Sequence, residues 1–149
     1  MLLSQQIEQD YIAAYKAREA VRLNTLRHIK TAAKNAQVSL MRPLEEAEYL
    51  DVIMKQVKQR QDSIEQFTQA GRQDLAVQEE AELAVLAAYM PKALSAEETN
   101  AAVDVAINET GAVSIQEMGK VMQAVLGKYK GQVDAKVLST LVRERLASK

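Results

Sequence analysis

Apolar side chains recur at every third or fourth position through most of the chain, the spacing that places them on one face of an α-helix. In the first ninety residues this pattern predicts four helices, and their apolar faces start at Leu3, Leu26, Leu50 and Leu75. Pro43 and Pro91 end two of these helices because proline has no N–H to donate, and Gly71 interrupts a third. Four helices of this length predict hairpins of long antiparallel helices.

Arg60 falls on the apolar face of the third predicted helix, between Val57 and Ile64. Two interpretations are open for a basic residue at such a position. It is either a buried partner for an acid, or it lies with its aliphatic stem along the apolar face and its guanidinium in water.

After Pro91 the helices become shorter and their ends are marked by capping residues. Ser95 to Glu98 and Ser114 to Glu117 both have the sequence of a capping box, and Gly111 is typical of a left-handed C-terminal cap. Asp134 is a good N-cap for a last helix, which is expected to bury Val137, Leu138, Leu141 and Val142. The sequence therefore predicts an all-α protein with an N-terminal lobe at 1–91, a hinge at Met90 to Leu94 and a three-helix lobe at 95–149.

The charge balance changes this picture little. The chain of 149 residues has 19 basic and 20 acidic side chains, a net charge of −1, and no cysteine. Residues 16–34 are strongly basic and residues 45–82 strongly acidic, which favours neighbouring helices of opposite charge over two separate binding patches. No apolar run is long enough for a membrane helix, and the first ten residues lack the pattern of a signal peptide. We expect a cytoplasmic protein without a membrane partner.

No residue pattern indicates catalysis. His28 is the single histidine and has no carboxylate three or four residues away, so neither a metal site nor a catalytic dyad is expected there. Ser4, Ser95 and Ser114 are predicted as helix N-caps, and the adjacent glutamate pairs point to different sides of a helix. We expect no catalytic residue, no metal and no cofactor.

Basic side chains offer the remaining candidates for a site. The stretch GKYKGQVDAK, residues 127–136, gathers lysines beside Gly127 and Gly131, whose bare amides suit an anion, and beside a tyrosine ring of the kind that stacks on a base. The candidates for RNA binding are Lys120, Lys128, Tyr129, Lys130, Gly131 and Lys136. An alternative basic stripe on the second helix consists of Arg27, Lys30 and Lys34. The simpler interpretation of the loop is a helix C-cap at Gly127 and a turn at Gly131.

Four long segments carry a resemblance to a known family: LRHIKTAAKNAQV, KQRQDSIEQFTQAGRQDLA, EEAELAVLAAYMPKALSAEE, and INETGAVSIQEMGKVM followed by KGQVDAKVLSTLVRERL. In this order they resemble the free-standing YqeY-like proteins, whose helical fold is shared with the tail domain of the B subunit of the tRNA-dependent amidotransferase. In the loop, Lys120, Lys128, Lys130, Gly131 and Asp134 match the family pattern. Gln132 stands where an arginine is usual, which removes one candidate contact to phosphate.

The resemblance implies a non-catalytic accessory module that binds tRNA weakly through the basic loop. An alternative is a protein–protein adaptor in an assembly for tRNA aminoacylation or tRNA-dependent amidation. A third function, carbon–nitrogen ligase activity with glutamine as amido donor, follows from family association alone.

Overall fold

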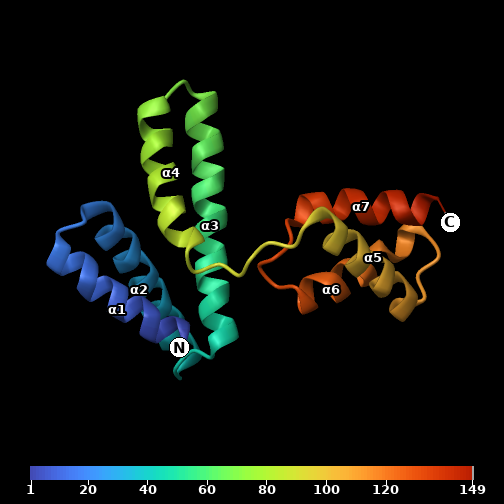
Figure 1. Cartoon of the computed structure of the whole chain (residues 1–149), viewed down its shortest axis with the longest axis horizontal. Helices are drawn as coiled ribbons and strands as arrows, with labels where there is room; N and C mark the ends of the chain where they lie inside the picture. Colours follow the sequence, from blue (N-terminus) through green and yellow to red (C-terminus); the bar gives the residue numbers. More distant parts are fainter. Residues whose placement is uncertain (149) are drawn as a thin grey trace. The chain divides into compact units, whose positions relative to one another are not determined.

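The computed structural model describes residues 1–148, and the protein is all-helical over that range. Figure 1 shows the helices in chain order: α1 (Leu3–Ala17), α2 (Ala20–Leu40), α3 (Glu46–Gln69), α4 (Gln73–Ala87), α5 (Ala96–Thr110), α6 (Met118–Lys128) and α7 (Ala135–Ala147). A 3₁₀ turn, η1 (Ile115–Glu117), precedes α6. The chain divides into two compact units, Met1–Met90 and Pro91–Lys149, and each has its own cluster of buried apolar side chains.

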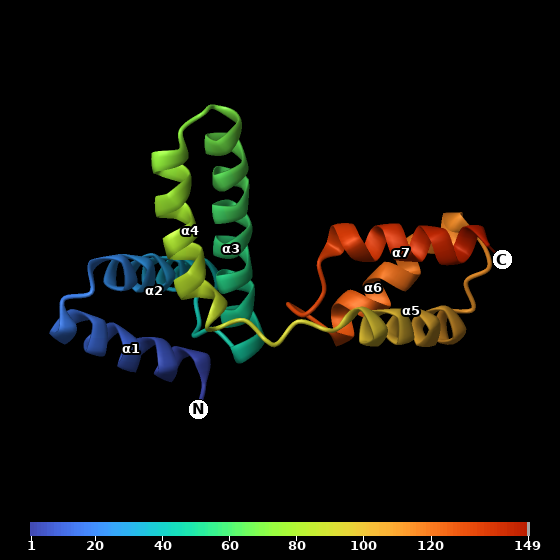
Figure 2. The same ribbon diagram turned by 45° about the horizontal axis from the view of Figure 1, so that its top comes forward.

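The N-terminal unit consists of two helical hairpins, α1 with α2 and α3 with α4, which both views show as side-by-side pairs (Figures 1 and 2). Its core contains Ile7, Ala14, Leu26, Ile29, Ile53, Leu86 and Tyr89. In α3 only Ile53 is fully buried, so most of the apolar face of this helix is half-covered by α4. The predicted face of α2 is buried at Leu26, Ile29 and Ala33 but not at Leu40, which is 46% exposed.

Left-handed residues end three helices of this unit. Gly71 has φ 72°, as expected for a glycine cap after α3, but Arg18 and Met41 also have φ 57°. At each of these two positions the next amide donates back across the turn, from Glu19 to the carbonyl of Ala14 and from Arg42 to that of Gln37. These bonds satisfy carbonyl groups at the helix ends, and they allow a non-glycine residue to stay in a conformation that ordinarily costs energy.

In the C-terminal unit α5, α6 and α7 pack against one another around a core that includes Val103, Val121, Val125, Leu138 and Val142. Several predicted caps of this unit are confirmed. The Ser95 hydroxyl accepts from the Glu98 amide at 3.1 Å, Gly111 has φ 70°, and the Asp134 carboxylate accepts from the Lys136 amide at 2.8 Å.

Three local predictions are wrong. Ser4 lies inside the first turn of α1, whose N-cap is Leu2, because the exposed amide of Leu3 already donates to Glu46 at 2.8 Å. Ser114 makes no side-chain cap, since Glu117 turns instead to the Val113 amide at 2.5 Å. Val137 is 55% exposed, because the buried face of α7 runs through Leu138, Val142 and Leu146.

The basic second helix, α2, packs against α3 and α4 of the acidic stretch, as the charge pattern predicted, but the ion pairs of Lys30 and Arg22 lie elsewhere. Lys30 lies 2.8 Å from Glu8, and Arg22 lies 3.5 Å from Asp10, so both ion pairs go to α1 and not to the acidic stretch. Within that stretch, Arg60 forms ion pairs with Glu79 and Glu82 of α4. The Arg60 side chain is 12% exposed, so the first of its two interpretations, a buried partner for acids, is the correct one.

Candidate nucleic-acid interface

The basic loop joins the end of α6 to the start of α7 by a hydrogen-bonded turn. The amide of Gln132 donates to the carbonyl of Tyr129 at 2.9 Å, and Gly131, the third residue of this turn, has φ 76°. A positive φ at that position defines a type II turn and favours glycine strongly. The turn predicted at Gly131 is therefore present.

Gly127 does not take part in the turn. It lies inside α6, which continues to Lys128, and it has no positive φ. The prediction that Gly127 caps the helix is wrong because the amide of Tyr129 still donates to Val125 at 2.9 Å and extends the helical bonding past the glycine. Of the two glycines in the stretch, only Gly131 supplies backbone freedom.

Two further contacts hold the loop in place. The carbonyl of Gln132 accepts a hydrogen bond from the amide of Leu94 at 2.9 Å, which ties the loop to the segment before α5. Asp134 then caps α7 through the Lys136 amide. The loop is thus a defined part of the C-terminal unit, fixed by bonds at both of its ends.

The candidate cations differ in their positions. Lys128 and Lys136 are exposed at the ends of α6 and α7 that the loop connects, and the Lys128 ammonium lies 5.6 Å from the centre of the Tyr129 ring. Lys130 is half-buried within the turn. Lys120 lies in the first turn of α6, about 12 Å along the helix axis from Lys128, so the structure does not bring it to the loop.

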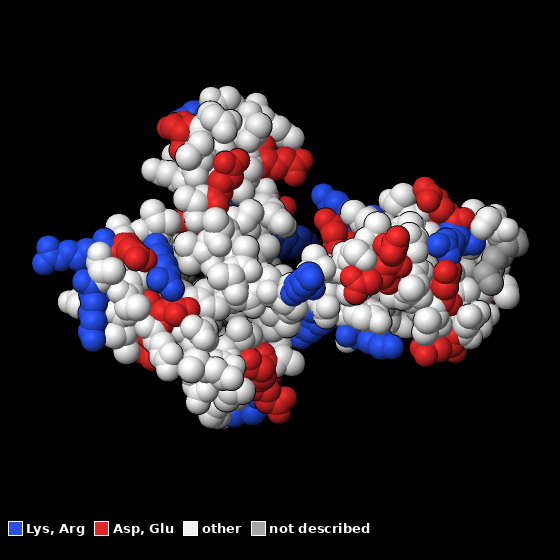
Figure 3. All heavy atoms as spheres, viewed as in Figure 1, with Lys and Arg blue, Asp and Glu red and all other residues white. Residues whose placement is uncertain are grey.

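The alternative basic stripe on α2 is interrupted at its centre. Lys30 forms an ion pair with Glu8, and its ammonium lies 4.0 Å from the centre of the Tyr11 ring. Both contacts lie within the N-terminal unit, so Lys30 is less available to an RNA phosphate than an exposed lysine. Arg27 and Lys34 are exposed on either side of it. Figure 3 shows acidic and basic side chains interspersed on the visible face of each unit, without a continuous basic surface there.

The single histidine of the chain takes part in a contact between helices. His28 is exposed, and its Nδ1 atom lies 2.8 Å from a terminal guanidinium nitrogen of Arg60. Because that arginine nitrogen is a donor, the His28 Nδ1 atom is the acceptor, and its proton belongs on Nε2. Within residues 1–148 no group of three or more metal-binding side chains comes together.

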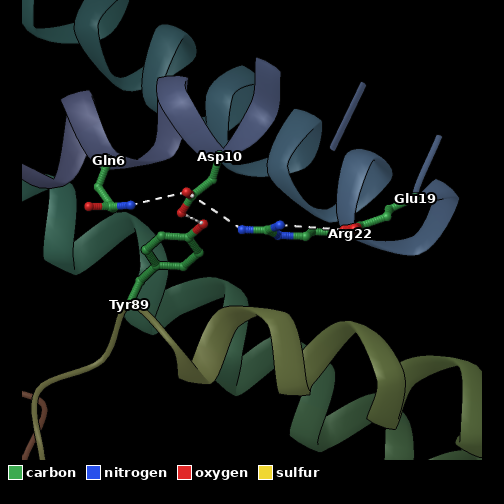
Figure 4. A network of polar contacts seen from close by, with 5 residues as sticks. All are labelled: Gln6, Asp10, Glu19, Arg22 and Tyr89. Carbon is green, nitrogen blue, oxygen red and sulfur yellow. Dashed lines mark hydrogen bonds and ion pairs between the residues drawn. The ribbon is translucent and has the colours of Figure 1, made fainter. Parts of the chain in front are cut away.

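The sequence did not predict the polar network of the N-terminal unit, which Figure 4 shows. The Asp10 carboxylate receives the Tyr89 hydroxyl at 2.5 Å and the Gln6 amide at 3.0 Å, and Arg22 lies 3.5 Å away. Burial, together with the bond to Asp10, raises the pKa of the Tyr89 hydroxyl strongly. The two ends of the central bond are 79 residues apart, so no local pattern could have revealed it.

Comparison with known proteins identifies the family of this chain. The family model described as Yqey-like protein matches residues 4–146. The chain belongs to the YqeY-like family. No helix among residues 1–148 is both long and apolar enough to cross a membrane.

Curated relatives carry the name "Altered inheritance of mitochondria protein 41, mitochondrial". The one from Eremothecium gossypii is 33% identical over 106 residues, which are 69% of this chain and 58% of that protein. The one from Pyrenophora tritici-repentis is 29% identical over 148 residues, covering 96% of this chain and 80% of the relative. The chain thus spans just over half the length of the Eremothecium relative. The word mitochondrial describes those proteins, and a cytoplasmic location for this chain stays a prediction.

Proposed function

We propose that this protein is a non-catalytic accessory module that binds tRNA weakly through the loop at residues 127–136. One observation carries the proposal: a single type II turn gathers lysines at the junction of two helices, with Lys128 before it, Lys130 within it and Lys136 after it. Lysine ammonium groups attract phosphates without reading base sequence, so such a surface positions RNA more than it selects it.

The helix N-terminus beside the loop adds little to the attraction of the loop for anions. The N-terminus of α7 carries a partial positive charge from its free amides, but Asp134 already occupies that end as a cap. With three lysines and one carboxylate in the loop, we expect weak binding that depends steeply on salt. Gln132, which replaces the arginine usual in the family, lowers the expected affinity further.

We assign no catalytic role to this protein because several of its reactive side chains have structural roles. Ser95 and Glu98 cap α5, while Glu79 and Glu82 neutralise Arg60. Each of these side chains would have to break its structural hydrogen bond or ion pair before it could act as a nucleophile or a base. In this proposal, glutamine hydrolysis and amide transfer belong to another protein.

Fluorescence anisotropy of labelled tRNA tests the proposal. Three lysine–phosphate contacts predict a slope of log affinity against log salt of about −2 to −3, at roughly −0.7 to −0.9 for each contact. Lys128→Ala/Lys130→Ala should reduce the affinity and remove about two thirds of that slope. The matched control is Arg27→Ala/Lys34→Ala, which removes two exposed cations of the N-terminal unit and should change neither quantity.

Two results would overturn the proposal. If the loop variant binds tRNA with the affinity and salt slope of the wild type, the loop is a turn without a role in RNA binding. If the wild type binds no tRNA at all, the adaptor alternative replaces the RNA-binding function.

A further inference from the structure

One side of α5 has small apolar side chains that are only partly covered. Ala101 is exposed and Val105 is 46% exposed, while Ala102 between them is 6% exposed and belongs to the core of the unit. Glu98 precedes them by one turn, and Glu109 follows Val105 by one turn. The face therefore presents small apolar residues between two acids that are 11 positions apart.

Tyr129 closes one side of this face and turns it into a groove. A cavity of about 200 Å³ is lined by Leu94, Glu98, Ala101, Ala102, Val105 and Tyr129. A smaller neighbouring depression shares Tyr129 and Val105 and extends to Glu109 and Lys128. An apolar cavity of roughly 150 Å³ takes up benzene, so the larger space holds one leucine-sized or aromatic side chain. We call the two together the Tyr129 groove.

The charge around the groove decides which kind of macromolecule suits it. Helix α5 carries Glu97, Glu98, Asp104 and Glu109 and no basic residue, a net charge of −4 over residues 96–110. Asp104 is paired with Arg145, whereas Glu98 and Glu109 lie in the lining of the groove. The amide of Ser95 holds the pKa of Glu98 below its usual value, so this carboxylate is ionised at neutral pH.

An acidic groove repels the phosphates of RNA and attracts cations. Lys128 in the lining and Lys92, which acts on Glu98, offset part of this charge, while α5 itself carries four acids and no basic residue. The apolar floor in turn favours a partner with its own apolar stripe. Both properties are combined in an amphipathic helix with lysine or arginine beside its apolar face.

We propose that the Tyr129 groove is a docking surface for a basic amphipathic helix of a protein partner. One apolar side chain of the partner enters the cavity beside Tyr129, and its basic residues reach Glu98 and Glu109. These acids are about 16 Å apart along α5, so the partner needs about three helical turns with a cation near each end. The inference does not depend on RNA binding by the loop.

A titration followed by NMR of the full-length, ¹⁵N-labelled protein tests this surface. The probe is a designed helical peptide of about three to four turns with leucines at positions i, i+3, i+4 and i+7 and lysines beside them. We expect shifts confined to the amides of α5 and of the segment around Tyr129. A second peptide with every lysine replaced by glutamate should cause none.

Two matched pairs of variants locate the contact. Val105→Gln removes an apolar side chain from the groove without adding a charge and should weaken binding several-fold, whereas Val113→Gln, at a site that is 68% exposed outside the groove, should not. Glu109→Gln should weaken binding several-fold, while Glu97→Gln, on the same helix outside the groove lining, should leave it unchanged.

Three results would overturn the inference. The first is equal binding of the lysine and glutamate peptides, and the second is retention of affinity in Val105→Gln. The third is a single-stranded RNA oligonucleotide that shifts the same α5 amides and loses affinity in Val105→Gln, which would make the groove a nucleobase site. The first two do not bear on tRNA binding by Lys128 and Lys130, so the two proposals fail separately.

Discussion

The hydroxyl of Tyr89 donates a 2.5 Å hydrogen bond to the carboxylate of Asp10, which joins the turn after α4 to the middle of α1. Tyr89 is 8% exposed and is the residue before Met90, where the N-terminal unit ends. The same carboxylate is also held by Gln6 and Arg22. This network fixes the last residues of the N-terminal unit against its first helix (Figure 4).

Tyr89→Phe is expected to lower the free energy of unfolding by about 1.5 to 3 kcal/mol, because it removes a hydrogen bond to a charged group and leaves the ring packing intact. Urea denaturation followed by circular dichroism measures the change. Tyr15→Phe, at a tyrosine that is 63% exposed, is the matched control and should cost little. Equal effects of the two variants would show that the Asp10 bond does not stabilise the unit.

The same bond predicts a loss of stability at alkaline pH. Burial and the bond to Asp10 raise the pKa of Tyr89 in the folded state above the ordinary value of 10.0. The unfolded chain therefore loses this proton first, so the contribution of Tyr89 is complete below that value and decreases as the pH rises above it. The test compares the free energy of unfolding of the wild type with that of Tyr89→Phe from about pH 8 to about pH 11. The difference between the two proteins should become smaller over the upper part of this range. A constant difference would contradict the prediction.

Arg60→Ala should destabilise the N-terminal unit by about 1.5 to 3 kcal/mol, because it leaves Glu79 and Glu82, which are 20% and 22% exposed, close together without their cation. The matched control is Arg72→Ala, which breaks the exposed pair with Asp74 and should cost at most about 1 kcal/mol. Chemical denaturation of the two variants side by side measures the difference. A cost for Arg60→Ala as small as that of the control would mean that water replaces the guanidinium freely.

The two glycines of the basic loop should respond in opposite directions to alanine. Gly131→Ala places a β-carbon at φ 76° and should cost about 1 kcal/mol. Gly127→Ala lies within α6, where a β-carbon would meet nothing within 4 Å, and should stabilise the unit by about 0.5 to 1 kcal/mol. Thermal denaturation checks both signs, and destabilisation by Gly127→Ala would contradict the helical position of that residue.

Limited proteolysis should separate the two units. Lys92 is exposed in the non-helical segment between Pro91 and Ser95, before Leu94 makes the first hydrogen bond to the C-terminal loop. Trypsin should therefore cut after Lys92 before it cuts inside either unit, as mass spectrometry of the first fragments would show. First fragments that end within residues 50–67 would contradict the division into two independently folded lobes.

Local chemistry within a few residues was enough for the sequence to predict much of the helical fold. The caps at Ser95, Gly111 and Asp134 and the turn at Gly131 depend on groups at most four positions apart, and all are present. Where a distant group changed the local bonding, the prediction failed. At the start of α1, Ser4 was expected to accept the capping hydrogen bond, but Glu46 accepts one from the Leu3 amide there.

The sequence by itself therefore determined the helix pattern, the family and the set of loop lysines, because these follow from spacing and residue type along the chain. Only the tertiary structure decided that Arg60 joins Glu79, Glu82 and His28, that Tyr89 reaches Asp10, and that Tyr129 forms a groove with α5. These contacts depend on which helix faces meet and in what register. Residues 19 to 79 positions apart come together there only after the helices have packed.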